Sequence, residues 1–198
     1  MRCAFVNARL LDPASGMDQT GGLLVIDEAI ADVGPHIRPG QLSPDIEWID
    51  CRGHCLAPGL VDMRTQFREP GQEHKETLDS ISRAAAAGGI TALVGLPNTD
   101  PVIDDVAVVE FVARRAREVK LVKIFVYGAV TKGLAGKQLV EMGLLREAGA
   151  LAFTDGLRAV RNAQVMRNAL SYAKAFDALL IQHPEDPDLS HGGHMNEG

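Results

Sequence analysis

From residue 56 onward the chain alternates short apolar runs with amphipathic segments, and this alternation constrains the fold more than any other feature. The apolar runs predict strands at 56–62, 90–96, 121–127, 150–153 and 178–182. The amphipathic segments predict helices at 75–87, 104–118, 136–148 and 162–175. Strands that alternate with helices form a parallel sheet, because each helix returns the chain across one face of the sheet. The predicted fold class is therefore α/β.

Start and stop signals mark the limits of several of these helices. Gly88-Gly89 follows the first helical pattern and predicts its end. Asp104 or Asp105 is the predicted N-cap of the second helix, whose inward face carries Val109 and Val112. Asn162 is the predicted N-cap of the last helix. Local sequence thus agrees with the periodicity.

Two parallel architectures fit these strands and helices: an open doubly wound sheet and a (β/α)8 barrel. No G-x-G-x-x-G follows the first strand and no phosphate-binding loop occurs in the sequence, so nucleotide-binding open sheets lose support. A complete barrel needs about 250 residues. We therefore expect residues 56–198 to form the N-terminal part of a TIM-type (β/α)8 barrel, with about five β/α strands. Its open strand edges favour a homo-oligomer.

The first 55 residues have a different pattern. Short apolar runs at 3–7, 22–26, 29–33 and 47–50 predict strands. Turn signals separate them at Asp12-Pro13, Gly21-Gly22, Gly34-Pro35 and Pro39-Gly40, and Asp27-Glu28 is the predicted tip of a hairpin. We therefore divide the chain into a small β-sheet or β-sandwich domain, residues 1–55, and a partial barrel, residues 56–198.

Composition and charge exclude several kinds of partner. The net charge is −6, so the chain lacks the basic field that attracts nucleic acid. No apolar run is long enough for a membrane span, and the N-terminus has no signal-peptide pattern, so we expect a cytoplasmic protein. The three cysteines are expected to be free thiols; a metal clip at Cys51 and Cys55 finds no second pair of ligands.

Polar residues recur just after the predicted strands. On a barrel the C-terminal ends of the strands meet at one mouth, where the loops carry the chemistry. The alternative is that loops are polar for solvation alone. We expect the clustering to indicate a site built from Asp62, Arg64, Gln66, Arg68, Asn98, Asp100, Tyr127, Lys132, Asp155, His183, Glu185 and Asp186.

Four segments together resemble one protein family. Residues 58–71, P-G-L-V-D-M-R-T-Q-F-R-E-P-G, resemble the first metal-binding strand of dihydroorotases and related cyclic amidohydrolases, P-G-[LIV]-[LIV]-D-x-H-x-H-[LF]-R-E-P-G. P-N-T-D-P at 97–101 is similar to the family's M-P-N-T-x-P loop. A-F-T-D-G at 152–156, I-Q-H-P-E-D at 181–186 and M-N-E-G at 195–198 are similar to later motifs in the same order.

The resemblance implies a fold, a reaction and roles for single residues. The family folds as a TIM-type barrel. Its members use zinc to hydrolyse the cyclic amide of dihydroorotate, which opens the ring to give N-carbamoyl-aspartate; both compounds belong to pyrimidine biosynthesis. Arg68 would bind the substrate carboxylate, and Asn98 would hydrogen-bond the same ligand. Asp155 and His183 occupy positions of metal ligands. The family's third histidine and its catalytic aspartate fall beyond residue 198.

The sequence departs from the family where the metal is bound. Arg64 and Gln66 occupy the positions of the paired histidines, and Gly156 replaces the second aspartate of the D-D-G loop. A guanidinium is permanently charged and has no lone pair, and an amide oxygen is a weak zinc ligand. We expect weak metal binding or none, and no catalytic residue is assigned. We further expect Arg64 to pair with Asp62 or Asp155.

Three readings therefore remain open. The chain is a zinc-dependent hydrolase of the family, impaired in catalysis. Alternatively it is a non-catalytic scaffold, because metal-less homologues of the family assemble with aspartate carbamoyltransferase. In the third reading it is a remnant in which Arg68 and Asn98 still hold a small carboxylate resembling dihydroorotate.

Overall fold

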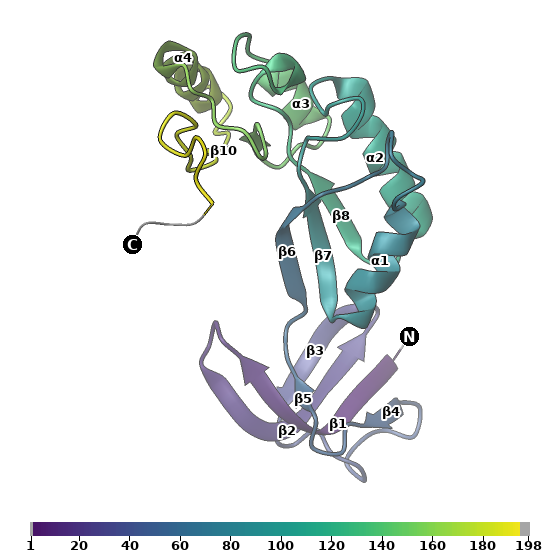
Figure 1. The fold of residues 1–198 in the computed structure, drawn as a ribbon. Coiled ribbons are helices and arrows are strands. Elements are labelled where there is room, and N and C mark those ends of the chain that lie inside the picture. The colour runs from purple at the N-terminus through teal and green to yellow at the C-terminus, as the bar shows by residue number, and fades with distance from the viewer. Residues whose placement is uncertain (1, 195–198) are drawn as a thin grey trace. The chain divides into compact units, whose positions relative to one another are not determined.

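The computed structural model describes residues 2–194. The chain divides into two compact units between Pro58 and Gly59 (Figure 1). The sequence predicted a boundary between residues 55 and 56. The family motif at residues 195–198 lies outside the described residues.

The described part of the first unit forms a five-stranded mixed sheet in the order β3-β2-β1-β4, with β5 also paired to β1. The strands are β1 (Arg2–Asp12), β2 (Met17–Ile26), β3 (Ala29–Gly34), β4 (Glu47–Asp50) and β5 (Cys55–Leu56). Asp27 and Glu28 form the tip of the β2–β3 hairpin, both with positive φ, as a tight hairpin turn requires. Ala4 and Val6 of β1 form a small core with Ile37.

The prediction of a turn at Gly21-Gly22 is wrong, because both glycines lie inside β2. They are needed there for close packing. A Cβ on Gly21 would lie 2.7 Å from the carbonyl oxygen of Gly34, and one on Gly22 would lie 2.4 Å from that of Ile37. The glycine pair marks a place where other backbone segments cross the strand closely.

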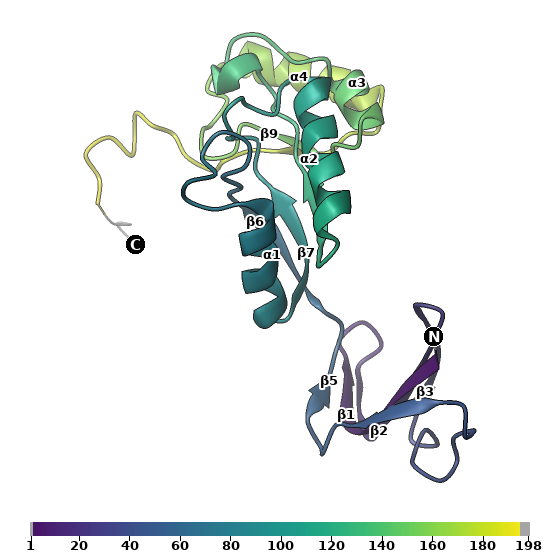
Figure 2. The same ribbon diagram turned by 90° about the vertical axis from the view of Figure 1, so that its right-hand side faces the viewer.

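The second unit contains a parallel sheet, β6-β7-β8, and a parallel pair, β9 with β10 (Figures 1 and 2). A parallel bridge between Gly128 and Phe153 connects the chain after β8 to β9. The elements are β6 (Leu60–Thr65), α1 (Leu78–Ala87), β7 (Ile90–Gly95), α2 (Val106–Val119), β8 (Lys123–Val126), the short 3₁₀ helix η1 (Lys132–Leu134), α3 (Met142–Glu147), β9 (Phe153–Thr154), α4 (Ala163–Lys174) and β10 (Leu180–Ile181).

The helix caps follow the sequence signals. Thr77 caps α1 and exchanges hydrogen bonds with Ser80 in a capping box. Of the two candidates for α2, Asp105 is the N-cap, and Val109 and Val112 are buried in the core of the second unit as predicted. Asn162 caps α4 through the N–H groups of its first turn.

Two predicted elements are corrected. The first strand of the second unit runs from Leu60 to Thr65 rather than from 56 to 62, so Arg64 lies on the strand itself. The predicted helix 136–148 begins only at Met142. Before it, Gly136 has a φ of +68°, and the Lys132 N–H donates to the Gln138 carbonyl oxygen. This loop hydrogen bond and the left-handed Gly136 replace the first helical turns.

Among the helices within residues 2–194, none is both long and apolar enough to cross a bilayer.

Candidate functional site

After β6 the side chains continue to alternate between two faces, as they do in a strand. One set is buried and the other is partly exposed. Thr65, Phe67 and Glu69 are buried, whereas the side chains of the intervening Gln66 and Arg68 are half-buried. Phe67 lies on Gly95 of β7, where an added Cβ would come within 2.2 Å of the ring. The sheet therefore fixes which side chains face away from the core.

Glu69 fastens this segment to two helices. One carboxylate oxygen accepts the N–H of Leu78, the first residue of α1, over 2.8 Å. The other accepts the Arg115 Nε–H of α2 over 2.6 Å, and the Arg115 guanidinium also contacts Glu118. A carboxylate at a helix N-terminus is also favoured by the helix dipole. Glu69 thus joins the loop to α1 and α2.

The loop that follows β7 lies directly against the loop that follows β6. The Asp100 N–H donates to the Pro70 carbonyl oxygen over 3.2 Å. A Cβ on Gly71, whose φ is +99°, would lie 2.0 Å from the Asp100 carbonyl oxygen. Only glycine allows this approach. The contact holds Arg68 and Asn98 in neighbouring loops.

Gln66 is the meeting point of the two residues predicted to bind substrate. Its Oε1 accepts from Arg68 Nη2 over 3.2 Å and from Asn98 Nδ2 over 3.4 Å. The Asn98 Oδ1 is buried and has no hydrogen-bond partner among the described residues. A buried acceptor without a donor is costly, so this oxygen is a position where a ligand N–H would be favourable.

Arg64 lies beside His183, at the edge of a hollow of about 80 Å³ that Tyr127 and Thr154 also line. Arg64 Nη2 is 3.4 Å from His183 Nδ1, and His183 Nε2 is 3.0 Å from Glu185 Oε2. Because a guanidinium can only donate, Nδ1 must accept and Nε2 must carry the proton donated to Glu185. Both imidazole nitrogens therefore have a partner.

Two pKa values near this hollow are displaced. Burial, followed by the nearby Asp62 carboxylate, raises the pKa of Tyr127. Hydrogen bonds from Ser190 and then His183 lower the pKa of Glu185. Tyr127 therefore keeps its proton in the hollow, and Glu185 keeps its charge beside His183.

The predicted ion pair of Arg64 with Asp62 or Asp155 is wrong. Asp62 accepts a hydrogen bond from the backbone N–H of Arg64, over 2.9 Å, but not from its guanidinium. Within residues 2–194 the guanidinium contacts His183 instead. Asp155, the other predicted partner, is instead held by donors of residues 130–131.

Asp155 is buried and accepts three hydrogen bonds. They come from the N–H groups of Val130 and Thr131, each over 2.9 Å, and from the Thr131 hydroxyl over 2.5 Å. Asp155 lines a hollow of about 280 Å³ together with Asn98 and residues 157–158, whereas His183 lines the hollow of Arg64. The two predicted metal ligands therefore line separate hollows.

These side chains do not fit a zinc ion. Arg64 has no lone pair, the Gln66 oxygen already accepts from two donors, and the Asp155 oxygens hold three. Across residues 2–194 no group of three or more His, Cys, Asp or Glu residues is placed to hold a metal. This donor set therefore does not support a chemical step through a bound metal.

Several residues that shape the site carry little signal in the sequence and were not predicted. Thr131 holds Asp155 and Arg115 holds Glu69, and both partners are distant in sequence. A local signal existed only for Thr131, a hydrogen-bonding residue just after a predicted strand. Arg115 stands among other basic residues in the sequence, a pattern that is typical of a solvated helix face.

Comparison with known proteins gives one family. A family model described as dihydro-orotase-like matches residues 53–198. A protein named dihydroorotase from Solibacter usitatus is 45% identical over 192 residues, with 97% of this chain and 44% of that protein covered. One of the same name from Anaplasma phagocytophilum is 48% identical over 197 residues, with 98% and 44% covered.

Solved structures with a similar fold are also known. L-hydantoinase from Arthrobacter aurescens superposes with a TM-score of 0.73 at 20% identity, over 93% of this chain and 41% of that one. A D-hydantoinase gives a TM-score of 0.71 at 21% identity, over 95% and 41%. At this identity the likeness shows the fold alone.

The fold is therefore a mixed α/β fold that these solved structures share. The chain belongs to the dihydro-orotase-like family, whose model matches most of its length. It spans about 44% of the length of the curated relatives it matches.

Replacing Glu69 by glutamine should lower the free energy of unfolding by about 1 to 3 kcal/mol, because a neutral amide cannot serve both Leu78 and Arg115. Glu118→Gln is the matched control. It removes the exposed partner of the same guanidinium and should change stability by less than about 1 kcal/mol. Urea denaturation followed by circular dichroism measures both. Equal losses in the two variants would contradict the assigned role of Glu69.

Proposed function

We propose that this chain acts in pyrimidine biosynthesis as a dihydroorotase-family protein that binds dihydroorotate or N-carbamoyl-aspartate. We further propose that it is impaired in zinc-dependent hydrolysis of the ring. One observation carries both parts: Arg68 and Asn98 meet on Gln66, while Arg64 lies beside His183. The substrate groups persist in this arrangement, but the metal ligands do not.

The proposed ligand matches the polar groups that remain free. Arg68 offers five N–H donors in a planar fork, of which one contact is made to Gln66, and a carboxylate suits the rest. The unpartnered Asn98 oxygen suits a ring or carbamoyl N–H. Dihydroorotate carries both kinds of group on one small ring.

The proposed architecture extends the described fold. We place the second unit as the N-terminal part of a TIM-type barrel of about five β/α strands, preceded by a small β-sandwich, because the hydantoinase folds superpose on nearly the whole chain. A cytoplasmic location agrees with the three free cysteines, which suit a reducing compartment.

A scaffold for aspartate carbamoyltransferase is the second candidate. β6 is an edge strand of its sheet, and Leu60, Val61 and Met63 on it are more than half exposed. An apolar strand edge of this kind favours association, either with a partner enzyme or with a second copy in a homo-oligomer.

Arg68→Gln should weaken dihydroorotate binding at least about tenfold, because the bidentate contact to the carboxylate is lost. Arg167→Gln, an exposed change on α4, is the control and should leave the affinity unchanged. Isothermal titration calorimetry measures both. Unchanged binding by the Arg68 variant would remove the basis for the carboxylate site.

Purified protein should contain essentially no zinc by plasma emission spectrometry, since Arg64 repels a dication and Gln66 is already engaged. The double variant Arg64→His/Gln66→His should raise the zinc content, because it restores two imidazoles on one strand face. Near-stoichiometric zinc in the unchanged protein would refute the proposed impairment. So would a double variant that takes up no more zinc.

If the scaffold candidate is correct, the chain should co-sediment with aspartate carbamoyltransferase at micromolar concentration. Met63→Glu should abolish the complex, because a charge on the exposed β6 edge opposes apolar docking. Analytical ultracentrifugation measures the complex. Free sedimentation of the two proteins would remove this candidate and leave the binding proposal untouched.

A further inference from the structure

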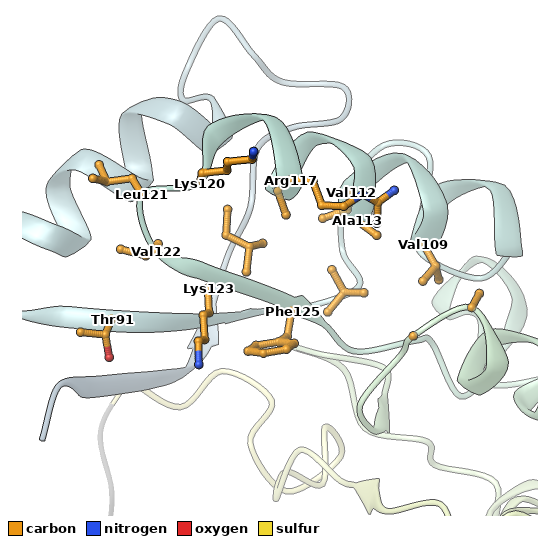
Figure 3. A pocket seen from close by; sticks show the side chains of 15 residues that line it. Thr91, Val109, Val112, Ala113, Arg117, Lys120, Leu121, Val122, Lys123 and Phe125 are labelled. Atoms are coloured by element: carbon orange, nitrogen blue, oxygen red, sulfur yellow. The ribbon is translucent and has the colours of Figure 1, made fainter. Parts of the chain in front are cut away.

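A groove of about 730 Å³ lies along β8, and none of the candidate-site residues lines it. In Figure 3, Val109 and Val112 of α2 lie above the strand, whereas Lys123 and Phe125 lie below it. The floor is apolar, yet Leu121 and Phe125 remain 51% and 37% exposed. Apolar side chains left open beside a strand indicate a surface with room for an extended chain.

One edge of β8 has backbone groups available for a further strand. The Tyr127 N–H donates to Gly95 of β7, so odd-numbered residues of β8 face β7. The even-numbered Val126 faces the other way, where its carbonyl oxygen accepts the Leu151 N–H. By the same alternation the N–H and C=O of Ile124 face the groove. Residues 151–153 lie along this edge from Val126 onward, so the open part of the edge is its N-terminal half around Ile124.

Three cations surround this edge. Arg117 and Lys120 at the end of α2, together with Lys123 on β8, line the groove. Within residues 2–194 none of the three has an ion pair. The net charge of the chain is −6, so this group of unpaired cations around an apolar floor makes the groove positively charged in a negatively charged protein.

We propose that this groove binds an extended acidic segment of a partner protein, which adds as a short strand beside the N-terminal part of β8, where the backbone groups of Ile124 face the groove. Backbone hydrogen bonds to Ile124 supply the register, and alternate apolar side chains of the segment cover the floor near Phe125. Its carboxylates lie against Arg117, Lys120 and Lys123.

A second copy of this chain is a poorer occupant. A two-fold pairing of β8 with β8 would bring Lys123 of each copy, and the cations of each α2, towards one another. Like charges at such an interface are repulsive. The charge of the groove therefore favours a segment of opposite sign.

The test uses a synthetic peptide with alternating valine and acidic residues, Glu-Val-Asp-Val-Glu-Val-Asp, labelled with a fluorophore. We expect the unchanged protein to bind it, as measured by fluorescence anisotropy. The variant Arg117→Glu/Lys123→Glu should bind at least about tenfold more weakly. The matched control Arg167→Glu/Lys174→Glu makes the same charge change on exposed positions of α4 and should bind like the unchanged protein.

Two N-methylated peptides separate strand addition from simple charge attraction. Each carries methyl groups on the backbone amides of one edge, and only the peptide blocked at the edge that faces Ile124 should lose affinity. Equal affinities of the two would overturn the proposal, as would equal binding by the two charge variants. A dimer of the unchanged protein that forms without peptide, and that the Arg117→Glu/Lys123→Glu variant does not form, would also overturn it. A second copy would then occupy the groove.

Discussion

The ion pair between Glu69 and Arg115 holds the loop on which the candidate site depends. The Glu69 carboxylate is 5% exposed and accepts hydrogen bonds from both Arg115 and the first residue of α1. Hydrogen bonds to a charged group are each worth about 1.5 to 3 kcal/mol. With the loop fixed in this way, strand alternation places Gln66 and Arg68 on the face away from the core, next to Asn98. A binding site of polar side chains requires a support of this kind.

The site retains groups that can bind a small ligand, but it does not retain groups that can bind a metal. Arg68 keeps donors and Asn98 keeps a buried acceptor without a partner, which together suit a small carboxylate with an N–H group. Arg64 lies beside His183 and takes up the lone pair that a metal would need. Asp155 already accepts three hydrogen bonds from Val130 and Thr131. Membership of the dihydro-orotase-like family therefore does not by itself imply that zinc is bound here.

Local signals predicted most of the elements, because periodicity and caps are properties of short segments. Asp105 and Asn162 cap the helices that they were expected to cap. The errors arose where contacts with other segments determine the structure. β2 continues through Gly21-Gly22 because other backbone segments pack closely against it, and α3 begins at Met142 rather than at residue 136. Arg115 contacts a carboxylate that is 46 residues away in sequence. No pattern in a single sequence specifies such a pair, and the position of the Arg64 guanidinium was mispredicted for the same reason.

The most direct measurement of the central claim is a crystal structure of the protein grown in zinc-containing solution, with an anomalous difference map recorded at the zinc absorption edge. We predict no anomalous peak within coordination distance, about 2.1 Å, of a His183 nitrogen, and a guanidinium of Arg64 in van der Waals or hydrogen-bond contact with that ring. A peak bound to His183, with Arg64 turned away from it, would contradict the claim that the guanidinium has displaced the metal.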